Sequence, residues 1–255
     1  MICKMPAEQL QEAVLALREA RKTVALTGAG ISVESGIPPF RGPGGLWEKY
    51  DPMKYAHIEA FERNPAEVWQ VLFMGMKKQL EKAQPNGAHR GLYRLQQMGK
   101  LKTVITQNID GLHQRAGNND VIEFHGSFAK HRCMVCRRDI ALQDLAFDKL
   151  PPHCACGGVV RPDVVMFGEA IPFYVLQRSR ELAATCDAML VIGTSATVEP
   201  AAHLPLIAKR SGAKIIEVNA EQTPLSRHIS DITLLGRAAN IMKQLADALE
   251  TASTV

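Results

Sequence analysis

The chain has 255 residues, of which 46% are hydrophobic and 22% are charged. That length suits one main domain with a small satellite, and that composition is typical of a globular protein rather than a disordered one. The formal net charge of +4 is spread along the chain without a basic stripe, which argues against a nucleic-acid-binding protein. Because no apolar run approaches the roughly 18 residues of a membrane helix and no signal peptide is recognisable, we expect a cytoplasmic protein.

Short apolar strands alternate with amphipathic helices along the chain. The first helix is expected at 8–20, and the first buried strand, at 23–27, stops at a glycine. Further strands are expected at 102–106, 121–124, 188–192, 214–218 and 231–235, and further helices at 87–98, 200–211 and 238–250. This alternation predicts an α/β fold with a mostly parallel sheet covered by helices on both faces.

Two stretches interrupt this alternation. Residues 38–86 are rich in proline and then helical, and residues 127–165 carry most of the cysteines. We expect these two insertions to form a smaller lobe, a helical part plus a cysteine module. The sheet domain would then consist of 1–37, 87–126 and 166–255.

Polar motifs follow five of the expected strands. They are Gly28-Ala29-Gly30, Gln107-Asn108-Ile109-Asp110, His125-Gly126-Ser127, Gly193-Thr194-Ser195 and Asn219-Ala220-Glu221. In an open parallel sheet, ligands bind in the crevice outside the carboxyl ends of the strands. The five loops are therefore expected to converge on one crevice.

The glycine turn at 28–30 is a candidate phosphate site, because a glycine turn between a strand and a helix lets the backbone approach a pyrophosphate. The fingerprint of a dehydrogenase is incomplete, however, since Val33 occupies the third glycine position and no second strand with an acidic residue at its end follows promptly to hold a ribose. A proline-rich loop follows instead, in which Phe40 is placed to cover a nicotinamide ring and Arg41 to meet a phosphate or an intermediate. The pattern favours a nucleotide site that differs from an ordinary hydride-transfer site.

The cysteines indicate a structural zinc ion. Two residues separate Cys133 from Cys136, and after seventeen more residues come Cys154 and Cys156, which are separated by one, so each pair can point two thiolates at one ion. Four cysteine ligands leave no open position for water, which disfavours zinc hydrolysis; His153 is an alternative ligand. The lone Cys186 is interpreted as a core residue and Cys3 as incidental.

His125 is the candidate general base among eight histidines. It ends the expected strand at 121–124 and precedes a flexible Gly-Ser pair, which places an imidazole at the crevice. An ordinary pKa near neutrality suits that side chain for proton abstraction.

Together these motifs resemble the sirtuin family of NAD-dependent protein deacylases, of prokaryotic type, over roughly residues 8–250. The resemblance rests on the glycine turn, the Gln-Asn-Ile-Asp motif, His125 and the cysteine pairs. It also rests on 36–41 (Gly-Ile-Pro-Pro-Phe-Arg), 161–169 (Arg-Pro-Asp-Val-Val-Met-Phe-Gly-Glu), Gly193-Thr194-Ser195 and Val218-Asn219.

The resemblance implies a Rossmann-like domain, a small zinc lobe and an acyl-lysine peptide or protein bound between them. It implies that the acyl oxygen attacks the ribose carbon of NAD that bears nicotinamide, with Ile109 and Asp110 holding the carboxamide. Asn108 and His125 would be catalytic, His125 as base on the ribose hydroxyls. The products would be free lysine, nicotinamide and O-acyl-ADP-ribose.

The resemblance also assigns binding residues. The expected peptide contacts are Val165, Met166, Phe167 and Gly168, where an extended peptide adds as a strand. The expected NAD contacts are Gly28, Ala29, Gly30, Ser32, Phe40, Arg41, Trp47, Gln107, Asn108, Ile109, Asp110, Gly193, Thr194, Ser195, Asn219, Ala220, Glu221 and Ala238.

Two positions depart from the family pattern. Pro39 stands where an Asp often precedes the Phe-Arg pair, so a polar role is lost there. Members that prefer succinyl or malonyl groups carry a Tyr-x-x-Arg pair, and this chain has Leu72 and Gly75 in the matching region. Without an arginine to pair a substrate carboxylate, we expect neutral acyl groups, and Leu72, Phe73 and Met74 could accommodate longer chains.

Three alternatives remain open at this point. A mono-ADP-ribosyltransferase would share the NAD site and differ in the attacking group. A zinc-ribbon nucleic-acid binder would need interleaved basic and aromatic residues, yet aromatic residues make up only 5% of the chain. A dehydrogenase is disfavoured by Val33 and by the missing acid for the ribose.

Overall fold

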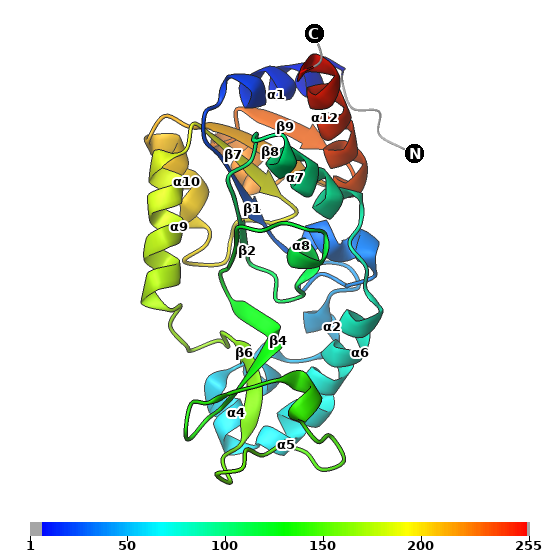
Figure 1. Cartoon of the computed structure of the whole chain (residues 1–255), viewed down its shortest axis with the longest axis vertical. Coiled ribbons are helices and arrows are strands. Elements are labelled where there is room, and N and C mark those ends of the chain that lie inside the picture. The colour runs from blue at the N-terminus through cyan, green and yellow to red at the C-terminus, as the bar shows by residue number, and fades with distance from the viewer. Residues whose placement is uncertain (1–6, 254–255) are drawn as a thin grey trace.

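The computed structural model describes residues 7–253, so Cys3 and its neighbours lie outside the described residues. The described chain contains two β-sheets, one of six strands and one of three. Figure 1 shows the larger sheet and its helices at one end of the molecule, next to α1 and α12, and the smaller sheet at the other end. No helix among the described residues is long and apolar enough to cross a membrane.

The larger sheet is entirely parallel, with the strand order β3-β2-β1-β7-β8-β9. Its strands are β1 (Thr23–Thr27), β2 (Thr103–Thr106), β3 (Val121–Glu123), β7 (Ala188–Ile192), β8 (Lys214–Asn219) and β9 (Ile232–Leu235). Every strand begins and ends within one residue of the position expected from the sequence. The predicted α/β fold with a parallel sheet is confirmed.

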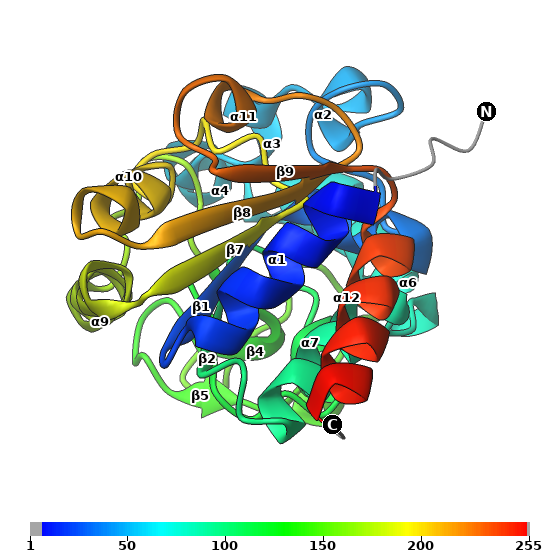
Figure 2. The ribbon, with the colours of Figure 1, turned by 90° about the horizontal axis from the view of Figure 1, so that it is seen from above.

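Helices cover both faces of this sheet (Figure 2). One face packs against α1 (Ala7–Glu19), α7 (Gly87–Gln97) and α12 (Ala238–Ser253), and the other against α9 (Phe173–Thr185) and α10 (His203–Arg210). In β7, Leu190 packs on the first face and Val191 on the second, and both are fully buried. A parallel strand covered on both sides is therefore apolar at consecutive positions.

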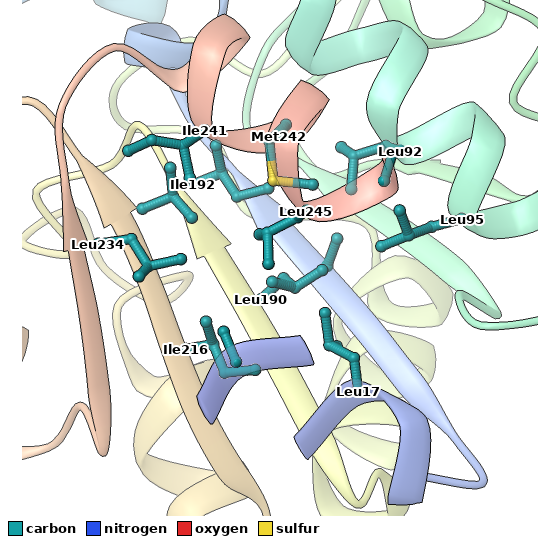
Figure 3. Packing of buried hydrophobic residues seen from close by; sticks show 14 of the residues in the cluster. Leu17, Leu92, Leu95, Leu190, Ile192, Ile216, Leu234, Ile241, Met242 and Leu245 are labelled. Atoms are coloured by element: carbon teal, nitrogen blue, oxygen red, sulfur yellow. The ribbon is translucent and has the colours of Figure 1, made fainter. Parts of the chain in front are cut away.

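The core on the first face joins helices from both ends of the chain. Leu17 of α1, Leu92 of α7 and Leu245 of α12 converge on Leu190 and Ile216 of the sheet (Figure 3). Full burial of one such side chain stabilises the fold by about 1.5–3 kcal/mol. This packing makes the sheet a rigid support for the loops at its carboxyl edge.

The smaller sheet is antiparallel, with the order β5-β4-β6. Its strands are β4 (Gly126–Cys133), β5 (Asp139–Ile140) and β6 (Val160–Val164). Beside it lie α2 (Leu46–Lys49), α3 (Pro52–Tyr55), α4 (Ile58–Arg63), α5 (Pro65–Val68), the π-helix η2 (Trp69–Phe73) and α6 (Met74–Lys82).

Trp69 joins the two inserted segments. Its ring packs against Phe73 and Phe147, and its Nε1 donates a hydrogen bond of 2.9 Å to the carbonyl of Val160 in β6. The indole is fully buried, so this polar atom needs its partner. The helical segment and the cysteine-bearing sheet thus share one aromatic core.

The direction of chain progression reverses beside β1, which has β2 on one side and β7 on the other. Short elements then complete the loops: η1 (Ala29–Ser35), α8 (Leu112–Arg115), η3 (Leu142–Asp144) and α11 (Pro224–His228). The loops after β1 and β7 leave the sheet toward opposite faces, which opens a crevice at their carboxyl ends.

Candidate functional site

A cavity of about 890 Å³ lies at this crevice. Its walls come from the loops after β1, β2, β3, β7 and β8, from the helical insertion and from the segment between β6 and α9. The five polar motifs that follow the strands therefore meet in one cavity, as their positions in the sequence predicted.

Most of the expected site residues line this cavity. They are Gly28, Ala29, Gly30, Phe40, Arg41, Trp47, Gln107, Asn108, Ile109, His125, Val165, Met166, Phe167, Gly168, Gly193, Thr194, Ser195, Asn219, Ala220 and Glu221. Three others are not among the residues that line it: Ser32 is fully buried, Asp110 hydrogen-bonds to Ser32, and Ala238 starts α12.

The glycine turn after β1 is packed against the loop after β7. A Cβ on Gly28 would lie 2.7 Å from the Cβ of Thr194, and one on Gly30 would lie 2.7 Å from the Cα of Gly193. Gly30 also donates a backbone hydrogen bond of 2.8 Å to the Gly193 carbonyl. Glycine is thus required at these positions by the contact between the loops, in addition to any approach of a phosphate.

His125 is oriented by one hydrogen bond to the backbone. Its Nδ1 lies 2.9 Å from the Gln107 carbonyl, which can only accept, so Nδ1 carries the proton. In the neutral ring Nε2 is then the unprotonated nitrogen and remains available as a base. Burial lowers the pKa of His125 below its ordinary value, opposed by the hydrogen bond to Gln107, and this keeps the ring neutral at pH 7.

A buried polar network supports the loop after β2. Ser32 Oγ donates to Asp110 Oδ2 at 2.7 Å and accepts from Asn108 Nδ2 at 3.1 Å. Asn108 also donates to the Gly28 carbonyl at 3.2 Å, which ties this loop to the glycine turn. Burial raises the pKa of Asp110, while hydrogen bonds from Leu112 and Ser32 oppose that effect.

His89 completes the network from α7. Its Nδ1 accepts from the backbone of Asn86, and its Nε2 lies 3.4 Å from Ser32 Oγ. Because Ser32 donates its own proton to Asp110, the Nε2–H of His89 is the donor in that contact. Burial lowers the pKa of His89 to about 4, so the ring is neutral in this network.

One end of the cavity extends into the helical insertion and is apolar. Leu72 and Phe73 of the π-helix and Met76 of α6 line it together with Ala56 and Ile109. Met74, expected to line it, instead packs against the aromatic core of the lobe. Met76 lies four residues after Leu72 and therefore on the same face of the helix, whereas Met74 does not, so Met76 takes that place.

The segment after β6 also lines the cavity, next to the helical insertion, and its shape is fixed by polar contacts. The fully buried Arg161 pairs with Glu169 at 2.5 Å, and the other oxygen of Glu169 accepts from the Met166 backbone at 2.9 Å. Phe167 exchanges backbone hydrogen bonds with Ala56 and Ile58 of the helical insertion. The expected peptide contacts thus lie on a segment of fixed shape, and sequence reasoning gave Arg161 and Glu169 no such role.

Several cavity residues carried no recognisable signal in the sequence. Val198, Glu199 and Pro200 line the cavity opposite the segment after β6, and Leu176 comes from α9. Gln222, Thr223 and Pro224 extend the wall beyond Glu221. They follow polar motifs that were recognised, but they form no motif themselves.

The four cysteine sulfurs lie within 4.8 Å of one another at the end of the small sheet. Cys133 Sγ is 3.5 Å from Cys156 Sγ, and Cys136 Sγ is 3.8 Å from Cys154 Sγ. Ligands at about 2.3 Å from a tetrahedral zinc ion are separated by about 3.8 Å, so the cluster fits zinc. His153 is not part of the cluster, and the cluster does not line the cavity.

Comparison with known proteins agrees with this geometry. The model of the Sir2 family matches residues 28–200. The chain belongs to the Sir2 family. It is 46% identical to an NAD-dependent protein deacylase of Aeropyrum pernix, over 95% of this chain and 98% of that protein. It is also 46% identical to an NAD-dependent protein deacetylase of Sulfurisphaera tokodaii, over 89% and 91%.

Solved Sir2 structures share the fold over nearly the whole chain. A Sir2 homologue in complex with NAD has a TM-score of 0.88 and 42% identity, and the match covers 95% of this chain and 94% of that one. A complex of Sir2 with a p53 peptide and NAD⁺ has a TM-score of 0.86 and 36% identity, covering 96% and 99%.

Proposed function

We propose that this protein is an NAD-dependent protein-lysine deacylase that transfers the acyl group to ADP-ribose and releases nicotinamide. The observation that carries the proposal is the position of His125. Its unprotonated Nε2 belongs to a cavity that has a polar, glycine-lined part and an apolar part. A base at such a site can act on NAD and on an acyl-lysine at the same time.

The loops after β1, β7 and β8 supply the NAD site. The turn from Gly28 to Gly30 and the loop from Gly193 to Ser195 surround the pyrophosphate. The N–H groups of Gly28, Gly30 and Gly193 already donate to backbone carbonyls, so Ala29, Thr194 and Ser195 present theirs to the phosphates. The run from Asn219 to Glu221 holds the adenosine end. Phe40, Arg41 and Trp47 cover the nicotinamide half. NAD supplies an activated ribose carbon, and the protein supplies orientation and a base.

Asn108 and His125 act on the reacting ribose. Asn108 is held by Gly28 and Ser32, so its amide is fixed beside the cavity. His125 takes the proton of a ribose hydroxyl on Nε2, while Nδ1 stays bound to Gln107. Asp110, Ser32 and Ala238 lie outside the wall; the first two position the loop that carries Asn108 and Ile109.

The substrate is an acyl-lysine in a protein or peptide. Its backbone lies along Val165 to Gly168, and the acyl group enters the apolar end beside Leu72. An ADP-ribosyltransferase reaction at the same NAD site would not require this apolar end, which favours deacylation. The zinc ion, held by the four cysteines, supplies structure to the small lobe.

We expect neutral acyl groups to be preferred. Arg41 is the only cation among the described residues that line the cavity, so a succinyl carboxylate beside Leu72 would be buried without a partner. On matched peptides with NAD, kcat/KM for succinyl-lysine should be at least about tenfold lower than for acetyl- or butyryl-lysine. Mass spectrometry of the products should show O-acyl-ADP-ribose and free lysine.

A Leu72→Arg variant provides the matched comparison. An arginine there offers a partner for the carboxylate and should shift the preference toward succinyl-lysine. A wild-type preference for succinyl-lysine would contradict the assignment of the acyl pocket. Transfer of ADP-ribose to protein without loss of the acyl group would contradict the deacylase function itself.

The pH dependence should reflect His125. Burial lowers its pKa below 6.5, and the base must be unprotonated, so activity is lost only as the pH falls through that lowered value. The acidic limb of a kcat/KM profile, measured between pH 4.5 and pH 8, should therefore have its midpoint below pH 6.5. A midpoint above 7 would contradict this account of His125.

The chain divides into an NAD-binding domain and a small lobe. We place the NAD-binding domain at 1–37, 87–126 and 166–255, and the small lobe at 38–86 and 127–165; the separate aromatic core around Trp69 supports this division.

We place the protein in the cytoplasm, because its four clustered thiols suit a reducing compartment.

A further inference from the structure

A buried carboxylate lies beneath the β8 side of the cavity. Glu217 is on β8, the strand next to the edge strand β9, and lies between Val191 of β7 and Thr233 of β9; its exposed fraction is 0%. Its two hydrogen-bond partners are hydroxyl groups. No ion pair links it to a Lys, Arg or His side chain within residues 7–253.

Stability alone does not account for a carboxylate in this position. Removing a carboxylate from water costs several kcal/mol unless it is paired, and an apolar side chain of similar volume is often as stable or more stable in such a place. Its neighbours on the same face of the sheet, such as Ile215, are apolar. The two hydroxyl groups that bind this carboxylate therefore indicate a role other than stability.

Glu217 holds both ends of the α11 segment. Thr223, directly before α11, donates from Oγ1 to Glu217 Oε1 at 2.5 Å. Ser230, two residues after α11, donates from Oγ to Glu217 Oε2 at 2.8 Å. One carboxylate thus fixes where the chain leaves and re-enters the sheet between β8 and β9.

The contact with Thr223 extends to the cavity wall. Because Thr223 Oγ1 gives its proton to Glu217, its lone pairs face the N-terminus of α11 and accept from Leu225 at 3.1 Å and Ser226 at 3.4 Å. Thr223 and the residues from Asn219 to Gln222 line the cavity. At the other end of this run, Asn219 Nδ2 donates to the Thr194 carbonyl at 2.9 Å.

We infer that Glu217 is a positioning residue for NAD: through Thr223 it sets the shape of the wall from Asn219 to Pro224 that receives the adenosine end. This inference rests on the proposed NAD contacts of that wall. Glu217 does not touch the cofactor, since it does not line the cavity. Glu217 keeps this short loop ordered before NAD binds. NAD binding then loses no free energy to the conformational entropy of ordering the loop.

The test compares Glu217→Leu, Glu217→Gln, Thr223→Val and Ser230→Ala. Glu217→Leu should raise KM for NAD and the Kd of ADP-ribose by about tenfold, as expected for loss of a charge-assisted hydrogen bond. The value of kcat and the KM for the acyl-peptide should change less than about twofold. Thr223→Val should give the same pattern.

The other two variants separate positioning from general stability. The carboxamide oxygen in Glu217→Gln still accepts from Thr223, so KM for NAD should recover to within about threefold of the wild type. Ser230→Ala loses only the contact remote from the cavity and should bind NAD normally. The double variant Glu217→Leu/Thr223→Val should bind no worse than the weaker single variant, because both substitutions remove the same hydrogen bond between Glu217 and Thr223.

Binding of ADP-ribose is measured by calorimetry, which is independent of deacylation. If ADP-ribose binds normally to a folded Glu217→Leu protein, or if kcat and both KM values change together, the positioning role is refuted. If Glu217→Leu does not fold, Thr223→Val decides the question by the same measurements. A wild-type protein that binds ADP-ribose but does not deacylate an acyl-lysine peptide would instead count against the proposed function.

Discussion

Replacement of His125 by Ala should lower kcat for NAD-dependent deacylation by about 10²- to 10⁴-fold, the usual contribution of a general base. The reason is geometric. Nδ1 donates to the Gln107 carbonyl, so Nε2 is the one ring nitrogen that can take a proton in the cavity. In the described residues that line the cavity there is no other histidine to replace it. Initial rates on an acetyl-lysine peptide measure the effect.

His228→Ala is the matched control, because it removes an exposed histidine that does not line the cavity. It should keep wild-type kcat. The His125→Ala protein should retain its thermal melting temperature and still bind ADP-ribose, since the glycine turn and the loop after β7 are intact. A folded His125→Ala protein with more than about a tenth of wild-type kcat would require a different base.

The larger sheet could be predicted almost completely from the sequence. Its strands are short apolar runs buried on both faces, and each ends at a polar or glycine-containing turn, so burial and turn chemistry indicate the same boundaries. The helix expected from residue 200 begins only at His203. The short helices between Leu46 and Val68 could not be predicted one by one from the sequence. Side-chain caps and the aromatic core define them, rather than helical periodicity.

The polar part of the site was predictable because each residue follows a strand in a recognisable motif. The apolar part was less so. Met76 shares a helix face with Leu72, four residues earlier, but the expected acyl contacts were taken as the consecutive residues Leu72, Phe73 and Met74, so Met76 was missed. The packing of Gly28 and Gly30 on Gly193 is likewise a contact between distant loops, which the sequence alone does not reveal.

Removal of the zinc site should unfold the small lobe, and activity should fall as a consequence. Cys133 ends β4 and Cys154 precedes β6, so a shared ion joins the two sides of the small sheet. Apparent zinc-binding free energies of about 10–16 kcal/mol in small zinc domains are comparable with the whole stability of a protein. In Cys133→Ser, or after chelation, the fluorescence of the buried Trp69 should shift to longer wavelength.

The loss of activity follows from the connection between the lobe and the cavity. β6 leads directly into the segment from Val165 to Gly168, and β4 begins next to His125, so disorder in this sheet displaces both the peptide wall and the base. Cys186→Ser is the control: that cysteine is buried away from the cluster and should leave one bound zinc per chain and normal activity. If Cys133→Ser or chelated protein kept both a protected Trp69 and full activity, the ion would have no structural role. When zinc is removed in part, KM for the peptide should rise before the Kd of ADP-ribose does, because the small sheet adjoins the peptide segment.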